Sequence, residues 1–164
     1  MLMEWVVDKI VHFESGDFVR NGLSHFGFHD RRGNHYAIFH QKHFLGLIGR
    51  NSKLKWTVAG HQVFPETPNI IAELNYPMYI DNLKDKTLLV SNFGDARIFR
   101  IDVEKMKTEL FVDGSKIGMK DVGNCVVDNE DTVWVNEVEG CRIWRFDNTG
   151  KPVLTLGDGV PGLD

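Results

Sequence analysis

The feature that most constrains the fold of this chain is an internal repeat with a period of 45 residues. Residues 96–102 (ARIFRID) and 141–147 (CRIWRFD) share four of seven positions. Two further pairs match upstream in the same order, residues 86–91 with 131–136 and 78–82 with 125–129. A fainter copy precedes them at residues 26–60. Because the matched segments keep their order, the chain is built from successive copies of one structural unit.

Each unit is predicted to contain four short β-strands, named a to d here in chain order. Runs of Val, Ile, Phe and Trp alternate with turns rich in Asn, Asp and Gly. In the last unit the strands are expected at residues 124–127, 132–136, 142–146 and 152–156. No segment shows convincing helical periodicity, and we interpret residues 102–110 as a long turn. The sequence therefore predicts an all-β fold.

A four-stranded unit of this length is the period of a β-propeller blade. The units resemble the NHL-type repeats of six-bladed β-propellers, in which one strand ends in Asp and an Arg-Ile pair opens a later strand. The segments that carry this resemblance are residues 122–128, 133–136 and 142–147, together with linker-like segments at 59–60 and 72–77. The resemblance implies a partial β-propeller of about three four-stranded antiparallel blades.

The repeat divides the chain into five segments. These are an N-terminal strand or hairpin at 1–25, blade 1 at 26–60, an inter-blade linker at 61–76, blade 2 at 77–114, and blade 3 with the start of the next linker at 115–164. Three blades do not close a ring, since propellers have roughly four to eight. Three interpretations stay open. Two chains pair as a homodimer that completes a six-bladed ring, a longer chain supplies the remaining blades, or the blades form an open arc or a differently packed barrel.

Polar residues gather at one end of the predicted blades. In a four-stranded meander the b–c turns and the entries to strand a share one end, where they surround the mouth of the central channel. The residues expected to bind a ligand there are Asn75, Tyr76, Asn92, Asp95, Asn124, Asn136 and Glu137, with His40, His43, Met78, Phe93, Gly123 and Glu139 around them.

The oxygen atoms of this set suit a hard cation such as Ca²⁺ or Mg²⁺. The candidates to hold such an ion are Asn92, Asn124, Asn136 and Glu137. The simpler interpretation is that Asn and Asp are ordinary turn residues, because they tolerate left-handed backbone and bond to their own main chain.

Other recurring polar residues have structural explanations. Asp30, Asp81 and Asp128 recur at the end of strand a, and we expect them to cap the following turn. Arg97 and Arg142 recur at the start of strand c, and we expect them to anchor neighbouring blades by hydrogen bonds. The sequence has no Gly-x-Ser-x-Gly nucleophile motif, and no catalytic residue is assigned.

Charge and cysteine content restrict the partners and the compartment. The net charge is −4, which argues against a nucleic-acid partner. Cys125 and Cys141 lie on strands a and c, roughly 9–10 Å apart, so both are predicted to be free thiols, as in a reducing compartment. No apolar run reaches the roughly 18–20 residues of a membrane span, and the start does not resemble a signal peptide. We therefore expect a cytoplasmic protein with no membrane partner.

Three functions fit these observations. The first is a non-catalytic binding scaffold that takes a protein or small ligand at the channel mouth, as the resemblance to NHL-type propellers implies. The second is a divalent-metal-dependent hydrolase or lyase like the gluconolactonase-type or streptogramin-lyase-type propellers, which residues 133–137 resemble loosely. The third is an inactive truncated fragment.

Overall fold

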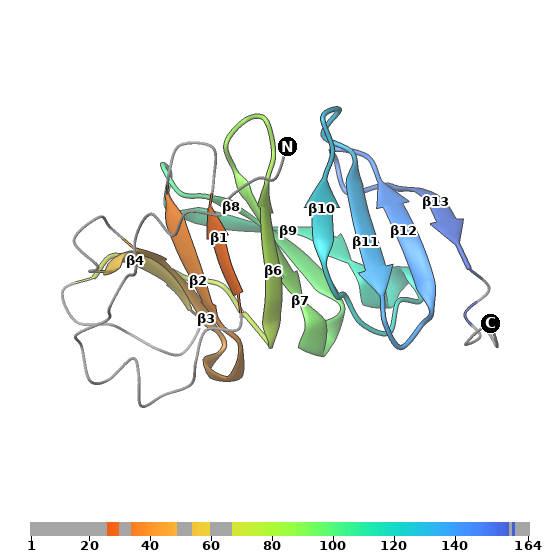
Figure 1. Cartoon of the computed structure of the whole chain (residues 1–164), viewed down its shortest axis with the longest axis horizontal. Coiled ribbons are helices and arrows are strands. Elements are labelled where there is room, and N and C mark those ends of the chain that lie inside the picture. Colours follow the sequence, from red (N-terminus) through yellow and green to blue (C-terminus); the bar gives the residue numbers. More distant parts are fainter. Residues whose placement is uncertain (1–25, 30–33, 49–53, 60–66, 158, 160–164) are drawn as a thin grey trace, which may run out of the picture.

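The computed structural model describes residues 26–29, 34–48, 54–59, 67–157 and 159. Three β-sheets stand side by side along the long axis of the molecule (Figure 1). The predicted hairpin at residues 1–25 lies outside the described residues. The described part of the chain contains no helix long and apolar enough to cross a membrane.

The sheets correspond to the three predicted blades. Blade 1 contains β1 (Phe26–His29), β2 (His35–Phe39), β3 (Phe44–Ile48) and β4 (Leu54–Ala59). Blade 2 contains β6 (Pro77–Asn82), β7 (Leu88–Asn92), β8 (Arg97–Asp102) and β9 (Lys107–Asp113). Blade 3 contains β10 (Cys125–Val127), β11 (Val133–Glu137), β12 (Arg142–Phe146) and β13 (Pro152–Leu156). Neighbouring strands in each blade are antiparallel, so the predicted fold class is confirmed.

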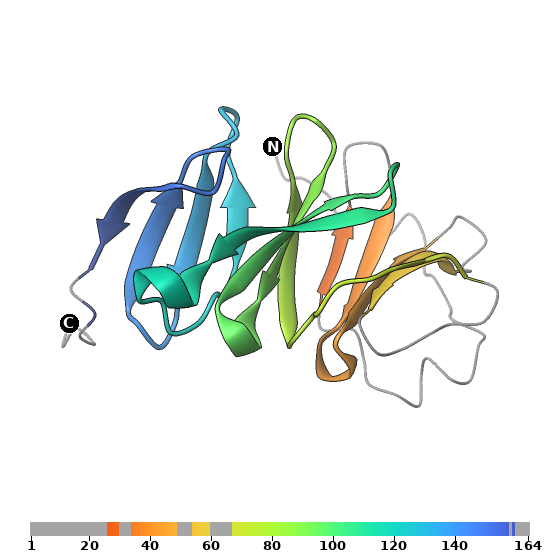
Figure 2. The same cartoon turned by 180° about the vertical axis from the view of Figure 1, so that it is seen from behind.

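Two details differ from the sequence prediction. Residues 69–70 of the predicted linker form β5 (Asn69–Ile70), which pairs in parallel with β4. The long turn expected at residues 102–110 is wrong in its second half, because β9 begins at Lys107 and pairs with β8. Most residues of β9 are exposed or half-buried, because this strand lies at the edge of its sheet. Its sequence therefore does not need to alternate between apolar and polar residues, and the pattern that would have indicated a strand is missing. Figure 2 shows β9 from behind, at the outer edge of the twisted second sheet.

The turns repeat as faithfully as the strands. Residues with left-handed backbone recur at equivalent turn positions of blades 2 and 3, in the pairs Lys86 and Asp131, Ala96 and Cys141, and Met106 and Gly150. His43 has the same conformation in the b–c turn of blade 1. Since L-residues rarely adopt this conformation, its recurrence shows that the period of the sequence is also a period of backbone geometry.

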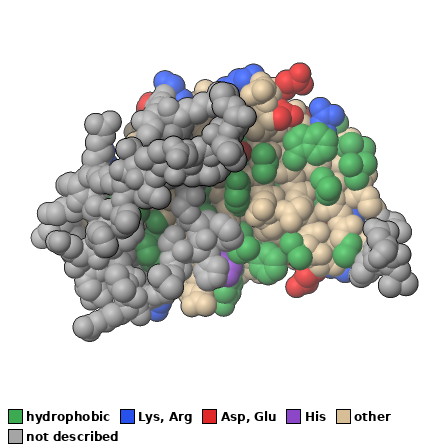
Figure 3. Space-filling model, in the orientation of Figure 1, with side chains coloured by type: hydrophobic (Ala, Val, Ile, Leu, Met, Phe, Trp, Pro, Cys, Tyr) green, Lys and Arg blue, Asp and Glu red, His purple; other side chains and the backbone are tan. Residues whose placement is uncertain are grey.

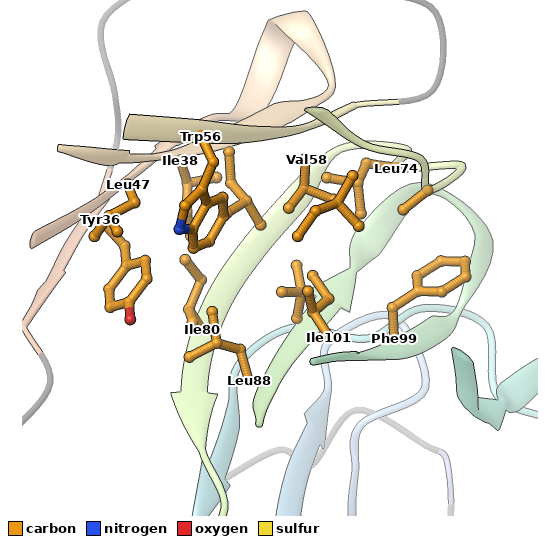
Figure 4. Close-up of a cluster of buried hydrophobic side chains, with 14 residues drawn as sticks. Tyr36, Ile38, Leu47, Trp56, Val58, Leu74, Ile80, Leu88, Phe99 and Ile101 are labelled. Atoms are coloured by element: carbon orange, nitrogen blue, oxygen red, sulfur yellow. The ribbon is translucent and has the colours of Figure 1, made fainter. Parts of the chain in front are cut away.

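The core lies between the blades. Tyr36, Ile38 and Trp56 of blade 1 point toward Ile80 and Leu88 of blade 2 (Figure 4). A second cluster joins blade 2 to blade 3, with Leu89 and Ile98 on one side and Val133, Trp144 and Phe146 on the other. Burying one such side chain stabilises the fold by roughly 1.5–3 kcal/mol, so the stacking of the blades contributes to the stability of the fold.

The first strands of the blades are spatial neighbours, because β1 contacts β6 and β6 contacts β10. The b–c turns therefore lie at one end of the stack, and the a–b and c–d turns at the other. The b–c turns contain the short 3₁₀ helices η1 (His40–Lys42) and η2 (Phe93–Asp95), and a third, η3 (Gly114–Ile117), leads from blade 2 into blade 3.

Candidate functional site

Three rings meet at the b–c end, where blade 1 adjoins blade 2. His40 and His43 come from the turn between β2 and β3, and Tyr76 precedes β6. The ring centroid of Tyr76 lies 4.8 Å from that of His40 and 4.7 Å from that of His43, and both pairs of rings meet edge-on. The backbone N–H of Tyr76 donates to Nδ1 of His43 at 2.9 Å, and Nδ1 of His40 lies 3.2 Å from the carbonyl oxygen of Pro77. The predicted site residue Tyr76 is therefore held by both histidines.

Asn92 and Asp95 lie at the b–c turn of blade 2. Asn92 is fully buried, and its Nδ2 donates to the carbonyl oxygen of Glu73 at 3.0 Å and to Oδ2 of Asp95 at 3.4 Å. Arg97 lies 3.7 Å from Oδ2 of Asp95 and 3.6 Å from the carboxylate of Glu73. Burial raises the pKa of Asp95, and the charge of Arg97 and the hydrogen bond from Asn92 only partly offset this.

Two oxygens of this cluster have no hydrogen-bond donor among the residues that the structure describes. Oδ1 of Asn92 and Oδ1 of Asp95 are buried and accept no hydrogen bond from the part of the chain that the structure describes. The two bonds that Asn92 donates fix the orientation of its amide, so the unpaired atom is the oxygen. Unpaired buried acceptors are uncommon in folded proteins and indicate a water, an ion or a ligand group.

Asn75 packs against the same turn. The N–H of Gly94 donates to the carbonyl oxygen of Asn75 at 3.1 Å. A Cβ at Gly94 would lie 2.7 Å from the side-chain atoms of Asn75, so glycine permits this close approach. Asn75 therefore shapes the turn that holds Asn92 and Asp95.

The other candidates lie in blade 3. Oδ1 of Asn136 accepts a hydrogen bond from the backbone N–H of Asn124, and the N–H of Gly123 donates to the carbonyl oxygen of Asn136. These bonds join the entry of strand a to the end of strand b. The structure therefore places Asn124 and Asn136 together, in a different blade from Asn92.

Glu137 is held inside blade 3. Its Oε1 accepts from the backbone N–H of Lys120 at 2.8 Å and from Nη2 of Arg142 at 2.8 Å. Its Oε2 accepts from Nε of Arg142 at 2.7 Å and from Nε1 of Trp144 at 2.7 Å. Burial tends to raise the pKa of this carboxyl, but the hydrogen bonds from Arg142, Trp144 and Lys120 outweigh it and lower the pKa. Glu137 therefore ties strands b and c to the linker that precedes blade 3.

The four predicted metal ligands come from two blades, Asn92 from blade 2 and the other three from blade 3. Within the described residues, no group of three or more His, Cys, Asp or Glu side chains is arranged to hold a metal ion. That observation leaves open sites built from amide and carbonyl oxygens. The metal-binding role of Asn92, Asn124, Asn136 and Glu137 stays a prediction.

Of the structural roles expected for the recurring polar residues, those of Asp128 and Arg142 are confirmed, whereas Arg97 makes ion pairs with Glu73 and Asp95. Asp128 caps its turn, because Oδ1 accepts from the N–H groups of Glu130 and Thr132. Arg142 reaches the carbonyl oxygen of Gly118 between blades 2 and 3 at 2.7 Å. Asp30 lies outside the described residues.

Asp81 has a different role from the turn cap that the sequence predicts. Its Oδ2 accepts from the N–H of Val127 in blade 3 at 2.8 Å, so it joins two blades, and its Oδ1 accepts from the N–H of its neighbour Asn82 within β6. No local sequence signal indicates this contact, because the two residues are 46 positions apart.

Both cysteines are free, as predicted. Cys125 is fully buried between blades 2 and 3, and burial raises the pKa of its thiol to about 12. Cys141 is half-buried, with its Sγ 3.7 Å from the carbonyl oxygen of Val138. Cys125 is therefore an inert core residue.

A cleft of 650 Å³ opens at the opposite end of the stack, where the sequence indicated no site. Its walls include the a–b turns of blades 2 and 3 and the c–d turn of blade 2. Two of the carboxylates there are already engaged, since Asp85 pairs with Arg100 and Asp102 with Lys105. The alternating Lys and Asp residues at 81–87 are the only sequence signal of this polar cleft.

No protein-family model and no curated protein matches the chain. Solved structures do match it. Virginiamycin B lyase from Staphylococcus aureus superposes with a TM-score of 0.63 at 18% identity, over 84% of this chain and 42% of the lyase. The luciferin-regenerating enzyme superposes with a TM-score of 0.62 at 16% identity, over 87% of this chain and 48% of the enzyme.

The chain has the fold of a partial β-propeller. A third structure, a protein of unknown function from Bacteroides caccae, agrees with a TM-score of 0.62 at 14% identity, over 80% of this chain and 48% of that protein. The partial propeller thus spans less than half the length of each of these three proteins. At such low identity the similarity shows only the fold, and the chemistry of the site has to be inferred from the residues of this chain.

Proposed function

We propose that this chain is an NHL-like propeller scaffold whose b–c end binds a small ligand or a segment of another protein, with no catalytic step assigned to its residues. The observation that carries the proposal is the fixed, exposed position of Tyr76. Its side chain is 42% exposed although it contacts two imidazole rings. Two free thiols favour a reducing compartment, and the proposal includes a cytoplasmic location.

Tyr76 is held before any partner arrives. Its backbone is left-handed, with φ of 49°, a conformation that costs energy for a bulky L-residue. The hydrogen bond to Nδ1 of His43 stabilises this conformation, and it requires the neutral form of His43 with its proton on Nε2. A large ring that is already fixed loses little conformational entropy when it binds a partner.

The chemistry of these rings favours an aromatic or amide-bearing group. Tyrosine offers a flat apolar surface with a polar hydroxyl, and Nε2 of His43 offers a hydrogen-bond donor. Aromatic side chains are enriched in binding surfaces for this reason. A peptide segment with an aromatic residue fits this description, and so does a small aromatic amide.

The test uses saturation-transfer NMR with three probes, the N-acetyl amides of tryptophan, tyrosine and phenylalanine. We expect saturation transfer from the wild-type protein to at least one probe, loss of the signal in Tyr76→Ala, and retention in Tyr76→Phe, which keeps the ring. Equal transfer from Tyr76→Ala and the wild type, or none from the wild type to any probe, would contradict the proposal.

A second candidate function rests on the unpaired oxygens of Asn92 and Asp95. Amide and carboxylate oxygens are ligands for Ca²⁺ and Mg²⁺, and a bound cation there would favour the metal-dependent hydrolase or lyase interpretation. Arg97 counts against it, because its positive charge lies 3.7 Å from the carboxylate of Asp95.

Calorimetric titration with CaCl₂ and MgCl₂ tests the second candidate. If it is correct, one cation binds to the wild type and to Asp147→Asn, a control at a distant turn, but not to Asp95→Asn. No heat with either salt would exclude it and would leave the Tyr76 proposal untouched.

A further inference from the structure

The two histidines that contact Tyr76 have opposite hydrogen-bonding roles. Nδ1 of His43 accepts the backbone N–H of Tyr76 at 2.9 Å, so this nitrogen carries no proton. Nδ1 of His40 lies 3.2 Å from the carbonyl oxygen of Pro77. Because a carbonyl oxygen can only accept, this bond requires a proton on Nδ1 of His40. Figure 3 shows a histidine side chain (purple) at the surface beside hydrophobic side chains, at the b–c end of the stack.

Acid therefore affects the two contacts differently. A protonated imidazole carries a proton on both ring nitrogens. The bond from His40 to Pro77 persists in that form, because Nδ1 of His40 is already the donor. The bond from Tyr76 to His43 does not persist, since two N–H donors would then face each other. Of these two contacts, only the one made by His43 is broken by a proton.

Tyr76 depends on this bond for its position. Its φ of 49° lies in the left-handed region, which bulky L-residues rarely adopt. The N–H of Phe93 donates to the carbonyl oxygen of Tyr76 at 3.0 Å and holds the following peptide. Without an acceptor on His43, the strained backbone loses the contact that offsets its cost. The ring of Tyr76, which is 42% exposed, then leaves its fixed position.

The charges at this junction do not decide the response. The linker residues 73–76 run beside the b–c turn of blade 2. The titratable and charged side chains that the structure describes on the turn of blade 1, the linker and the turn of blade 2 are His40, Lys42, Glu73, Tyr76, Asp95 and Arg97. Two of these are positive and two are negative at neutral pH, and Arg97 pairs with both carboxylates. The hydrogen bond to Tyr76 is therefore what distinguishes the neutral from the protonated form of His43.

We propose that protonation of His43 releases Tyr76, so that the b–c end is organised for binding near neutral pH and loses that organisation in acid. Histidine side chains in general titrate around about pH 6.5. A partner that binds the fixed form of Tyr76 favours the neutral imidazole, and by linkage a proton on His43 weakens the binding of that partner. The regulation of binding rests on the proposed function of Tyr76, whereas the release of Tyr76 does not.

NMR of the 164-residue chain without any ligand tests the release. At about pH 7.5, where most histidines are neutral, the ring nitrogen shifts should identify the Nε2-protonated tautomer of His43. Between about pH 7.5 and 5.5 the Tyr76 amide should lose protection against hydrogen exchange by at least about 5-fold, the equivalent of one ordinary hydrogen bond. Protection is taken relative to the intrinsic exchange rate at each pH, and its midpoint should match the protonation of His43. A His43 that titrates while the Tyr76 amide stays protected would overturn the proposal, and so would the Nδ1-protonated tautomer of His43.

His43→Asn separates this histidine from the other titratable groups. Asn tolerates the left-handed backbone of residue 43, whose φ is 55°, and its Oδ1 lies close to the position of Nδ1 but does not titrate. The matched control is His35→Gln, because His35 lies at the start of β2, at the other end of the stack. The ratio of Tyr76 protection at the two pH values should approach one in His43→Asn and keep the wild-type value in His35→Gln. A pH dependence that persists in His43→Asn would assign the response to another group, such as Asp95, whose pKa is raised by burial, and would refute the role of His43.

Binding measurements separate this inference from the proposed function. The N-acetyl amides of tryptophan, tyrosine and phenylalanine carry no group that titrates in this pH range, so a pH dependence of their binding belongs to the protein. We expect the affinity of the wild type to fall by at least about 5-fold between about pH 7.5 and 5.5, and the affinity ratio to approach one in His43→Asn. Release of Tyr76 without binding of any probe at either pH would contradict the proposed function and support the release. Equal affinity of the wild type at both pH values would overturn the regulation of binding.

Discussion

Replacing Glu137 by Gln isolates one buried charge without changing the shape of its side chain. The carboxylate of Glu137 has no exposed surface, and each of its oxygens accepts two hydrogen bonds. An amide group can accept at only one of these positions, because its NH₂ group donates. The variant would therefore leave two donors unpaired, and one of them belongs to the charged group of Arg142.

The structure gives the size of the expected loss. A hydrogen bond to a charged group contributes about 1.5–3 kcal/mol, so losing two amounts to about 3–6 kcal/mol. Removing one partner of a buried ion pair costs about 3–5 kcal/mol by comparison with other proteins. The two estimates agree on about 3–5 kcal/mol of unfolding free energy. For a chain of this size that lowers the melting temperature by about 6–20 °C.

Urea unfolding followed by tryptophan fluorescence measures this difference. The matched control is Glu109→Gln, because Glu109 also pairs with an arginine, Arg100, but its side chain is 65% exposed. Exposed pairs contribute about 0–1 kcal/mol. A loss in Glu137→Gln below about 1 kcal/mol, or no larger than in the control, would refute the reasoning that buried hydrogen bonds fix this turn.

The pH dependence of the same pair gives a second check. The pKa of Glu137 is lower in the folded protein than its ordinary value of 4.5, so the folded state favours the ionised form. Its contribution to stability is complete above pH 4.5 and declines as the pH falls toward the folded pKa. The stability difference between wild type and Glu137→Gln should therefore be constant near neutral pH and shrink in acid.

Two further predictions concern the turns and the thiols. Gly150 and Gly118 have φ of 83° and 81°, but a Cβ at Gly150 would overlap the carbonyl oxygen of Phe111 whereas nothing lies within 4 Å of one at Gly118. Gly118→Ala should lower the free energy of unfolding by only the left-handed backbone strain of about 1–2 kcal/mol, and Gly150→Ala should lower it by clearly more. Equal losses for the two variants in urea unfolding would contradict this. In the native protein a thiol reagent should modify Cys141 alone, and Cys125 should react only after unfolding, because it is fully buried. Rapid modification of two thiols in the native state would show that Cys125 is accessible.

The sequence was sufficient to predict the blades because their determinants are local. Strands β12 and β13 begin and end where the apolar runs at 142–146 and 152–156 begin and end. Two features escaped prediction because other parts of the chain cause them. Residues 69–70 form β5 because the packing of the chain brings them beside β4. Residues 107–113 form β9 because they pair with β8, although most of them are exposed or half-buried.

The candidate site was harder to predict, because its contacts cross between blades. The sequence placed Tyr76 at the b–c end, but its support by His40 and His43 depends on blade 1 packing against blade 2. It grouped Glu137 with Asn92, Asn124 and Asn136 by residue type. Alternation along β11 instead directs Glu137 toward the interior and Asn136 to the opposite side of the sheet.

Differences between equivalent positions of blades 2 and 3 bear on function. Asn92 and Glu137 both end strand b and both pair with an arginine at the start of strand c. In blade 3 the carboxylate is saturated by Arg142, Lys120 and Trp144. Phe99 replaces the tryptophan in blade 2 and supplies no donor, so the amide oxygen of Asn92 accepts no hydrogen bond from the described residues. The b–c turn of blade 3 is closed by its own hydrogen bonds. The corresponding turn of blade 2, in the same junction as Tyr76, contains the two buried acceptors on which the second candidate function rests.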